Sequence, residues 1–158
     1  MIKMSFEDFK NTDATDLTVG TLVSMIARGH AIFINHHIAD YDINSTQAHL
    51  LYEISLNDNI NQEQISARCN INKGAVARSI KKLEDKGFVV RKVDENNRRQ
   101  NKISLTPKGK ETLVKTKEIL DMWESEIIKS EGYVEKELLQ LVLKEIAIKT
   151  IELNHLEE

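Results

Sequence analysis

Cysteine and proline are nearly absent from this chain of 158 residues, which has one of each. A single cysteine cannot form an intramolecular disulfide, so noncovalent packing must hold the fold, and a reducing compartment is expected. One proline, together with 41% hydrophobic and 30% charged residues, favours a helix-rich globular protein over a disordered one. The length suggests one domain or two small ones.

Long apolar runs are also missing. The opening segment MIKMSFEDFKNTDATD lacks an apolar stretch followed by small residues at a cleavage site, so we expect no secretory signal. The stretch LTVGTLVSMIA at 17–27 is too short to span a bilayer. We therefore expect a cytoplasmic protein with no membrane partner.

Patterns typical of catalysis and metal binding are missing as well. The chain has no Ser/His/Asp order, no phosphate-binding loop and no dense spacing of metal ligands, so we expect no enzyme, no cofactor and no metal site. His30, His36 and His37 would need further ligands to hold a metal, and we interpret them as surface or interface residues. Cys69 occupies an inward helical position, which favours core packing.

The net charge of −3 hides an uneven distribution. Residues 61–110 hold 13 Lys and Arg against 5 Asp and Glu, a net charge of +8, whereas the rest holds 9 against 20, a net charge of −11. A basic segment between acidic flanks is typical of a module that binds a polyanion. Charge alone also fits an ordinary solvated face.

Apolar spacing and capping residues predict the order helix, helix, short helix, helix, hairpin, long helix, helix. Residues 17–38 place apolar side chains at spacings of three and four. Asn44 and Asn61 each precede a glutamine by three residues, an amide variant of the capping box that opens a helix. Thr106 and Pro107 open the long helix, with threonine as the cap and proline at the first helical position.

Residues 72–86 predict the second helix of a helix-turn-helix, between helix stops at Asn70 and Gly87. Small residues in its first turn would let the helix N-terminus approach another surface closely. Arg78, one turn further along the helix, could donate two hydrogen bonds to guanine, at O6 and N7. An ordinary charged outer face is the alternative. The inner stripe is Val76, Ile80 and Leu83, and the outer face is Gly74, Arg78, Lys81, Lys82 and Asp85.

The runs FVVRKV and NKISLT flank a polar tip, DENNRRQ at 94–100, and predict a β-hairpin. Arg98 and Arg99 at this tip suit a narrow minor groove, where the potential is most negative. Asp94 can hold one guanidinium in an extended pose. A self-contained turn that touches nothing is the alternative.

These elements predict a winged helix-turn-helix whose DNA contacts fall into three groups. The short helix offers Asn61, Gln62, Ser66 and Arg68, the recognition helix offers Asn72, Lys73, Gly74, Ala75, Arg78, Ser79 and Lys82, and the wing offers Asp94, Arg98 and Arg99.

The stretch NINKGAVARSIKKLEDKGFVVRKVDENNRRQNKISLTPKGKE at 70–111 resembles the core of the MarR family, the multiple-antibiotic-resistance type regulators. The shared features are Val-x-Arg in the recognition helix, Leu-Glu-x-x-Gly-Phe at its end, an acid-and-arginine wing and Leu-Thr-x-x-Gly. The resemblance implies an obligate homodimer, a pseudo-palindromic operator and release by a small phenolic or other anionic ligand.

The chain departs from the family pattern at one place in the wing. The family usually has a second aspartate directly before its arginines, where this chain has Asn97. By the resemblance, Arg99 is the better aligned residue for the minor groove. Arg28 and His30 are expected to border the family's ligand pocket, which lies between the dimer region and the DNA-binding lobe.

We therefore predict a mainly α fold with a minor β part. Residues 44–106 would form the winged helix-turn-helix DNA-binding domain, and 1–43 with 107–158 a helical dimerisation region, because a winged helix alone cannot cover the apolar residues of the terminal helices. The predicted function is a homodimeric, sequence-specific transcriptional regulator on double-stranded DNA, a repressor released by a small aromatic or anionic effector. The alternative is a winged helix used for nonspecific DNA architecture or protein contact.

Overall fold

The computed structural model describes residues 5–57, 59–97, 101–128 and 135–155, and it confirms the predicted mainly α fold with a small sheet. The helices are α1 (Phe6–Asn11), α2 (Val19–His37), α3 (Ser45–Leu56), α4 (Gln62–Cys69), α5 (Lys73–Asp85), α6 (Pro107–Ile128) and α7 (Lys136–His155), with short 3-10 turns η1 (Ala14–Asp16) and η2 (Ala39–Tyr41). The strands are β1 (Ile60–Asn61), β2 (Val89–Val93) and β3 (Asn101–Leu105).

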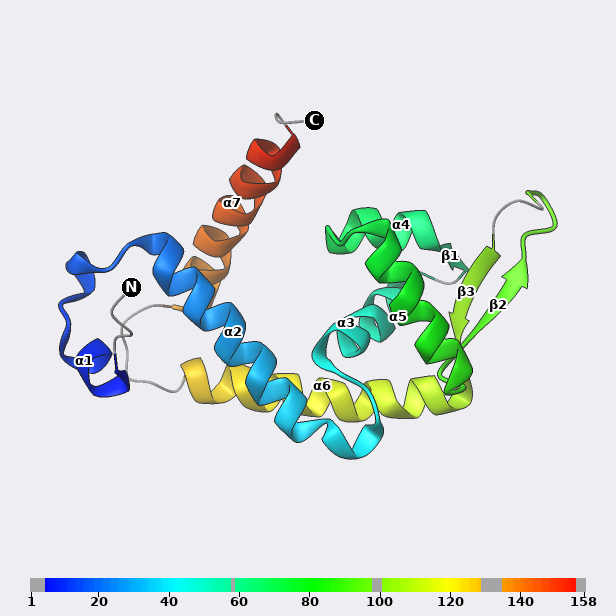
Figure 1. Ribbon diagram of the computed structural model, residues 1–158, viewed down its shortest axis with the longest axis horizontal. Helices are drawn as coiled ribbons and strands as arrows, with labels where there is room; N and C mark the ends of the chain where they lie inside the picture. The colour runs from blue at the N-terminus through cyan, green and yellow to red at the C-terminus, as the bar shows by residue number, and fades with distance from the viewer. Residues whose placement is uncertain (1–4, 58, 98–100, 129–134, 156–158) are drawn as a thin grey trace.

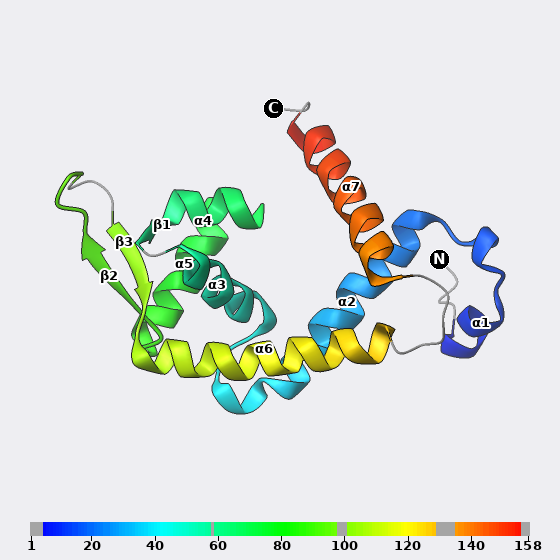
Figure 2. The ribbon, with the colours of Figure 1, turned by 180° about the vertical axis from the view of Figure 1, so that it is seen from behind.

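Two groups of elements are joined by one long helix. In Figure 1, α3, α4, α5 and the sheet form one group, the winged lobe, and α1, α2 and α7, the terminal helices, lie on the other side. Figure 2 shows the same arrangement from behind, with α6 running along both groups. Because α6 packs against both α2 and α3, it fixes the winged lobe relative to the terminal helices.

Local capping chemistry starts the helices of the winged lobe. The Asn44 side chain accepts from the Gln47 backbone N–H at 2.9 Å, and the Gln47 side chain accepts from the Asn44 N–H at 3.0 Å. Asn61 and Gln64 make the same exchange at 2.8 and 2.9 Å where α4 begins. Each exchange satisfies two backbone donors at a helix start, so both predicted capping boxes are confirmed.

Left-handed backbone ends the two helices of the helix-turn-helix. Asn70 has φ 50° directly after α4, and Gly87 has φ 77° shortly after α5. Asparagine tolerates this region and glycine has no β-carbon to clash there, so these two residues stop the helices where the sequence predicts. The turn at Asn70 therefore sets the position of α5 relative to α4.

The sheet is antiparallel, in the order β1-β3-β2. β2 and β3 form the predicted hairpin, in which Arg91 pairs with Ile103. On the other edge of β3, Ile60 of β1 also pairs with Ile103. The sequence did not predict β1, because a two-residue strand has no periodicity. This strand ties the start of α4 to the base of the wing.

The core lies inside the winged lobe and extends onto α2 and α6, whereas α7 and much of α2 expose apolar side chains. Among the described residues, no helix has the length and apolar character to cross a membrane. The largest buried side chains include Ile34, Ile38, Leu50, Leu51, Ile54, Ile65, Ile80, Leu83, Phe88 and Ile103. The exposed apolar residues include Val19, Val23, Ile26, Leu138, Leu141, Val142 and Ile146.

Candidate nucleic-acid interface

α5 buries its inner face and presents cations on its outer face. Val76, Ile80 and Leu83 are 1% exposed or less, as their spacing predicts. Arg78 and Lys82 are exposed, and neither has an ion-pair partner within the described part of the chain. These two side chains can therefore meet a polyanion without breaking a bond inside the protein.

The first turn of α5 is small and open. The Asn72 side chain accepts from the Gly74 N–H at 2.8 Å and so caps the helix. A β-carbon on Gly74 would lie 3.1 Å from Asn72 Oδ1 and 3.5 Å from Arg78 Nη1, with no third contact within 4 Å among the described residues. The guanidinium of Arg78 therefore lies back along the helix, over the first turn.

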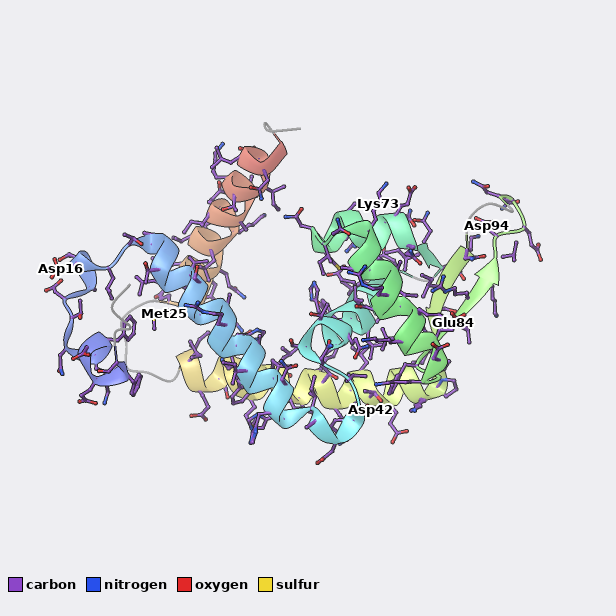
Figure 3. All side chains as sticks on the ribbon, viewed as in Figure 1. Asp16, Met25, Asp42, Lys73, Glu84 and Asp94 are labelled. Carbon is purple, nitrogen blue, oxygen red and sulfur yellow. The ribbon has the colours of Figure 1, made fainter. Side chains whose placement is uncertain are left out.

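Other predicted residues of α5 are less free. Lys73 Nζ lies 3.1 Å from Glu63 Oε1 of α4, although both side chains are largely exposed. Lys73 marks the start of α5 in Figure 3. Ala75 and Ser79 are half-buried on one flank of the helix. Lys73 and Ala75 flank Gly74 in the first turn of α5.

Two residues of α4 have roles that the sequence did not predict. Ser66 is buried, and its hydroxyl donates to the Ile71 carbonyl at 2.5 Å, which fastens the turn before α5. Arg68 Nε donates to Glu53 Oε2 at 2.9 Å and links α4 to α3. Because the Ser66 hydroxyl is buried and bonded to the Ile71 carbonyl, it is not available for the DNA contact that the sequence predicts. Arg68 could reach a phosphate only by leaving Glu53.

The start of α4 lies beside the wing. Asn61 and Gln62 line a hollow of about 500 Å³ together with Arg91 and Asn101 of the strands. The Asn61 side chain caps α4 and is thereby fixed, whereas Gln62 is half-buried at the rim. The helix start and the wing thus line one shared hollow.

The base of the wing is anchored on α5. Arg91 Nε of β2 lies 3.1 Å from Glu84 Oε2, an ion pair whose angle is poor for a hydrogen bond. Figure 3 shows Glu84 on the half of α5 that faces the strands. This contact links the orientation of the wing to the orientation of α5.

Asp94 organises the described part of the wing tip. Its carboxylate accepts from the Asn96 N–H at 2.9 Å and lies 3.3 Å from Lys102 Nζ. These contacts lower the pKa of Asp94, chiefly through the Asn96 N–H. Arg98 and Arg99 lie outside the described residues, so the predicted pairing of Asp94 with an arginine stays a prediction.

A separate cavity of about 440 Å³ lies between α2, α3 and α6. His30 lines it, but Arg28 does not. Two residues along a helix are about 200° apart, so Arg28 points away from the wall that His30 forms, and the ligand pocket itself stays a prediction. Sequence reasoning missed His49 and Tyr52, whose spacing of three on α3 was the available signal. The lining is His30, Ala31, Ile34, Ser45, Thr46, Ala48, His49, Tyr52, Ile71 and Leu120.

His30 is held at the wall of this cavity by its packing. Its ring meets the ring of Trp123 edge-on, with centroids 4.6 Å apart. Burial lowers the pKa of His30, and the nearby His49 lowers it further. Within the part of the chain that the structure describes, no group of three His, Cys, Asp or Glu could hold a metal.

The arrangement of α4, the turn at Asn70, α5 and the β2–β3 wing defines a winged helix-turn-helix protein, a class that binds DNA. The MarR family model matches residues 43–100. A MarR transcriptional regulator from Methanosarcina mazei Go1 is 32% identical with a TM-score of 0.78, over 85% of this chain and 97% of that one. The chain belongs to the MarR family, a family of transcriptional regulators.

Two further proteins are similar to this chain. The uncharacterized HTH-type transcriptional regulator YybA of Bacillus subtilis (strain 168) is 35% identical over 88 residues, which are 56% of this chain. The match spans 59% of the length of that relative. The structure of S. aureus MepR in a complex with DNA has a TM-score of 0.78 at 21% identity, over 84% of this chain and 98% of that one, and shares the fold.

Proposed function

We propose that this chain is a homodimeric, sequence-specific DNA-binding repressor of a pseudo-palindromic operator, without catalytic activity. The observation that carries the proposal is the outer face of α5. Arg78 and Lys82 are exposed and have no ion-pair partner among the described residues, and they follow a first turn that Gly74 keeps open. Such a helix can enter a major groove with its N-terminal residues at base edges.

The neighbouring elements support the same use. Gln62 and Lys73 lie at the helix starts, where backbone N–H groups and the helix dipole favour phosphate oxygens. In this proposal Arg98 and Arg99 extend from the wing into the flanking minor groove. The phosphate contacts at the helix starts and the minor-groove contacts of the wing would together fix the register of α5 on the duplex.

Exposed apolar side chains support dimerisation. Leu138 and Leu141 on α7 are 54% and 57% exposed, and Val19 and Ile26 on α2 are 63% and 55% exposed. Apolar surface of this extent is unfavourable in water, and a second copy would cover it. A two-fold dimer would present two α5 helices to successive major grooves, about 34 Å apart.

The cavity between α2, α3 and α6 supports control by a ligand. Its wall is mostly apolar, and His30, His49 and Tyr52 add polar groups, which suits a small aromatic or anionic effector. The cavity touches both the terminal helices and the winged lobe. A ligand could bind more tightly to a dimer conformation in which the spacing of the two α5 helices does not match successive major grooves. Such a ligand would increase the population of that conformation and so lower the affinity for DNA.

The test of DNA binding is selection of bound duplexes from a random pool at two salt concentrations. We expect the selected sequence to be palindromic. The slope of the logarithm of the binding constant against the logarithm of the salt concentration should give the number of phosphates contacted. Equal affinity for all duplexes would instead favour nonspecific DNA architecture or protein contact.

The effector test repeats the titration of the selected duplex with a phenolic carboxylate at saturating concentration. The parent protein should lose affinity, and His30→Ala should lose less, whereas His36→Ala serves as the control on the exposed side of α2. Unchanged affinity of the parent would contradict release by that compound.

A further inference from the structure

Few side chains at the start of α5 are free to form hydrogen bonds with bases. The Asn72 carboxamide oxygen is engaged as the helix cap, and Gly74 has no side chain. The Lys73 ammonium is directed toward Glu63 on α4. Ala75 offers only a methyl group. Of the exposed side chains in the first two turns of α5, Arg78 is therefore the one that has no ion-pair partner among the described residues.

The position of Arg78 supports this reading. Its Nη1 lies 3.5 Å from the place that a β-carbon on Gly74 would occupy, so the guanidinium extends toward the helix N-terminus. Helical side chains lean in this direction, and the N-terminal end is where recognition helices meet base edges. Without a carboxylate partner in the described residues, the planar fork needs two acceptors, and guanine O6 and N7 provide them.

The methyl group of Ala75 lies in the same turn, next to Gly74. Ala75 is half-buried, so part of it remains accessible, and it precedes Arg78 by three residues, about one helical turn. On the major-groove edge of DNA, the apolar partner for a methyl group is the 5-methyl of thymine, which cytosine lacks. Because Gly74 adds no bulk, the helix can approach closely enough for such a contact.

We infer that α5 reads each half-site through two adjacent groups, the guanidinium of Arg78 on a guanine and the methyl of Ala75 on the 5-methyl of a neighbouring thymine. This inference rests on the proposed function, because it specifies what the recognition helix reads. It gives Gly74 a positioning role, because without a side chain at this position the methyl group of Ala75 can approach the DNA closely.

The test uses the duplex obtained by selection, in which single bases are replaced by analogues that lack one functional group or ring nitrogen. Each thymine of one half-site is replaced in turn by deoxyuridine, and each guanine by 7-deazaguanine, and affinity is titrated at one salt concentration. For the parent protein we expect one thymine whose demethylation weakens binding about fourfold, the effect of one buried methyl group. A neighbouring 7-deazaguanine should weaken binding about tenfold or more.

The protein variants assign each effect to a residue. Ala75→Gly should bind the thymine and uracil duplexes equally, and Arg78→Ala should no longer distinguish guanine from 7-deazaguanine. Ala67→Gly, the same change on the exposed side of α4, should keep both preferences. If Ala75→Gly fails to fold, the uracil series on the parent protein decides alone.

The outcomes separate this inference from the proposed function. A selected palindrome with no thymine sensitive to demethylation, or an Ala75→Gly protein that keeps the sensitivity, overturns the methyl contact and leaves the regulator intact. A random pool that yields no preferred sequence overturns both.

Discussion

Gly109 in the first turn of α6 lies directly against the backbone carbonyl of Phe88, at the point where the wing begins. A β-carbon on Gly109 would overlap that carbonyl oxygen and lie 3.1 Å from the carbonyl carbon. The same oxygen accepts from the Thr106 N–H at 3.1 Å. The hairpin, the end of α5 and the start of α6 are therefore joined through one peptide group.

Gly109→Ala should destabilise the protein by about 1–3 kcal/mol or more, because the added methyl meets rigid backbone rather than a side chain that can move. Chemical denaturation followed by circular dichroism measures this loss. Gly20→Ala is the matched control, since a β-carbon on Gly20 in α2 has nothing within 4 Å in the described structure. Equal midpoints for the two variants would contradict the close approach.

Arg78→Ala should remove operator preference, while Lys82→Ala should weaken binding to all duplexes alike. A lost guanidinium fork on guanine costs about 1–3 kcal/mol for the specific sequence only, whereas a lost phosphate contact reduces the salt slope by about one. Gel-shift titrations of both variants on specific and random duplexes measure the difference. Unchanged specificity of Arg78→Ala would refute its role in recognition.

Local signals predicted the helix boundaries of the winged lobe. The capping boxes at Asn44 and Asn61 and the left-handed stops at Asn70 and Gly87 depend on residues within a few positions of each other. The capping box of Ser5 and Asp8 that opens α1 is equally local, yet α1 was missed because its six residues are too short for a clear periodicity.

Contacts between distant segments were harder to predict. The pairing of Ile60 with Ile103 and the ion pair of Arg68 with Glu53 depend on how α3, α4 and the wing pack. The sequence shows that Ser66 is on a helix, but not that the helix turns its hydroxyl inward onto Ile71. His30 lines the cavity between α2, α3 and α6 and Arg28 does not, and a ligand pocket in this region stays a prediction.

Asp94→Ala should loosen the wing tip without unfolding the lobe. The Asp94 carboxylate accepts from the Asn96 N–H, so its removal should speed hydrogen exchange at that amide. Lys102→Ala removes the ion pair but keeps this hydrogen bond, so exchange at Asn96 should change little. Nuclear magnetic resonance of the two variants makes the comparison, and equal exchange rates at Asn96 would contradict the proposed role of Asp94.

Cys69 should be unreactive in the folded protein. Burial, with a smaller contribution from the nearby Glu53, raises the pKa of its thiol to about 11. Since the thiolate is the reactive form, native protein should react slowly with a thiol reagent at pH 8, and denatured protein quickly. Rapid reaction of the native protein, or loss of DNA binding after mild peroxide treatment, would contradict this prediction.

His30 should make the protein less stable as the pH falls. Burial and the neighbouring His49 lower the pKa of His30 below its ordinary value of 6.5. Between that value and the lowered one, the unfolded chain binds more protons than the folded chain, so the free energy of unfolding decreases as the pH falls through 6.5. This decrease in the free energy of unfolding is complete once the pH is below the lowered pKa of His30.

His30→Gln should therefore flatten the dependence of unfolding on pH below 6.5, since it removes the group whose protonation the fold opposes. Denaturant titrations at a series of pH values measure the slope, and His36→Gln on the exposed side of α2 is the control. Parallel slopes for the parent and His30→Gln would show that another group controls acid sensitivity. The predicted flattening would confirm that the cavity between α2, α3 and α6 disfavours a charged imidazole in the absence of an anion.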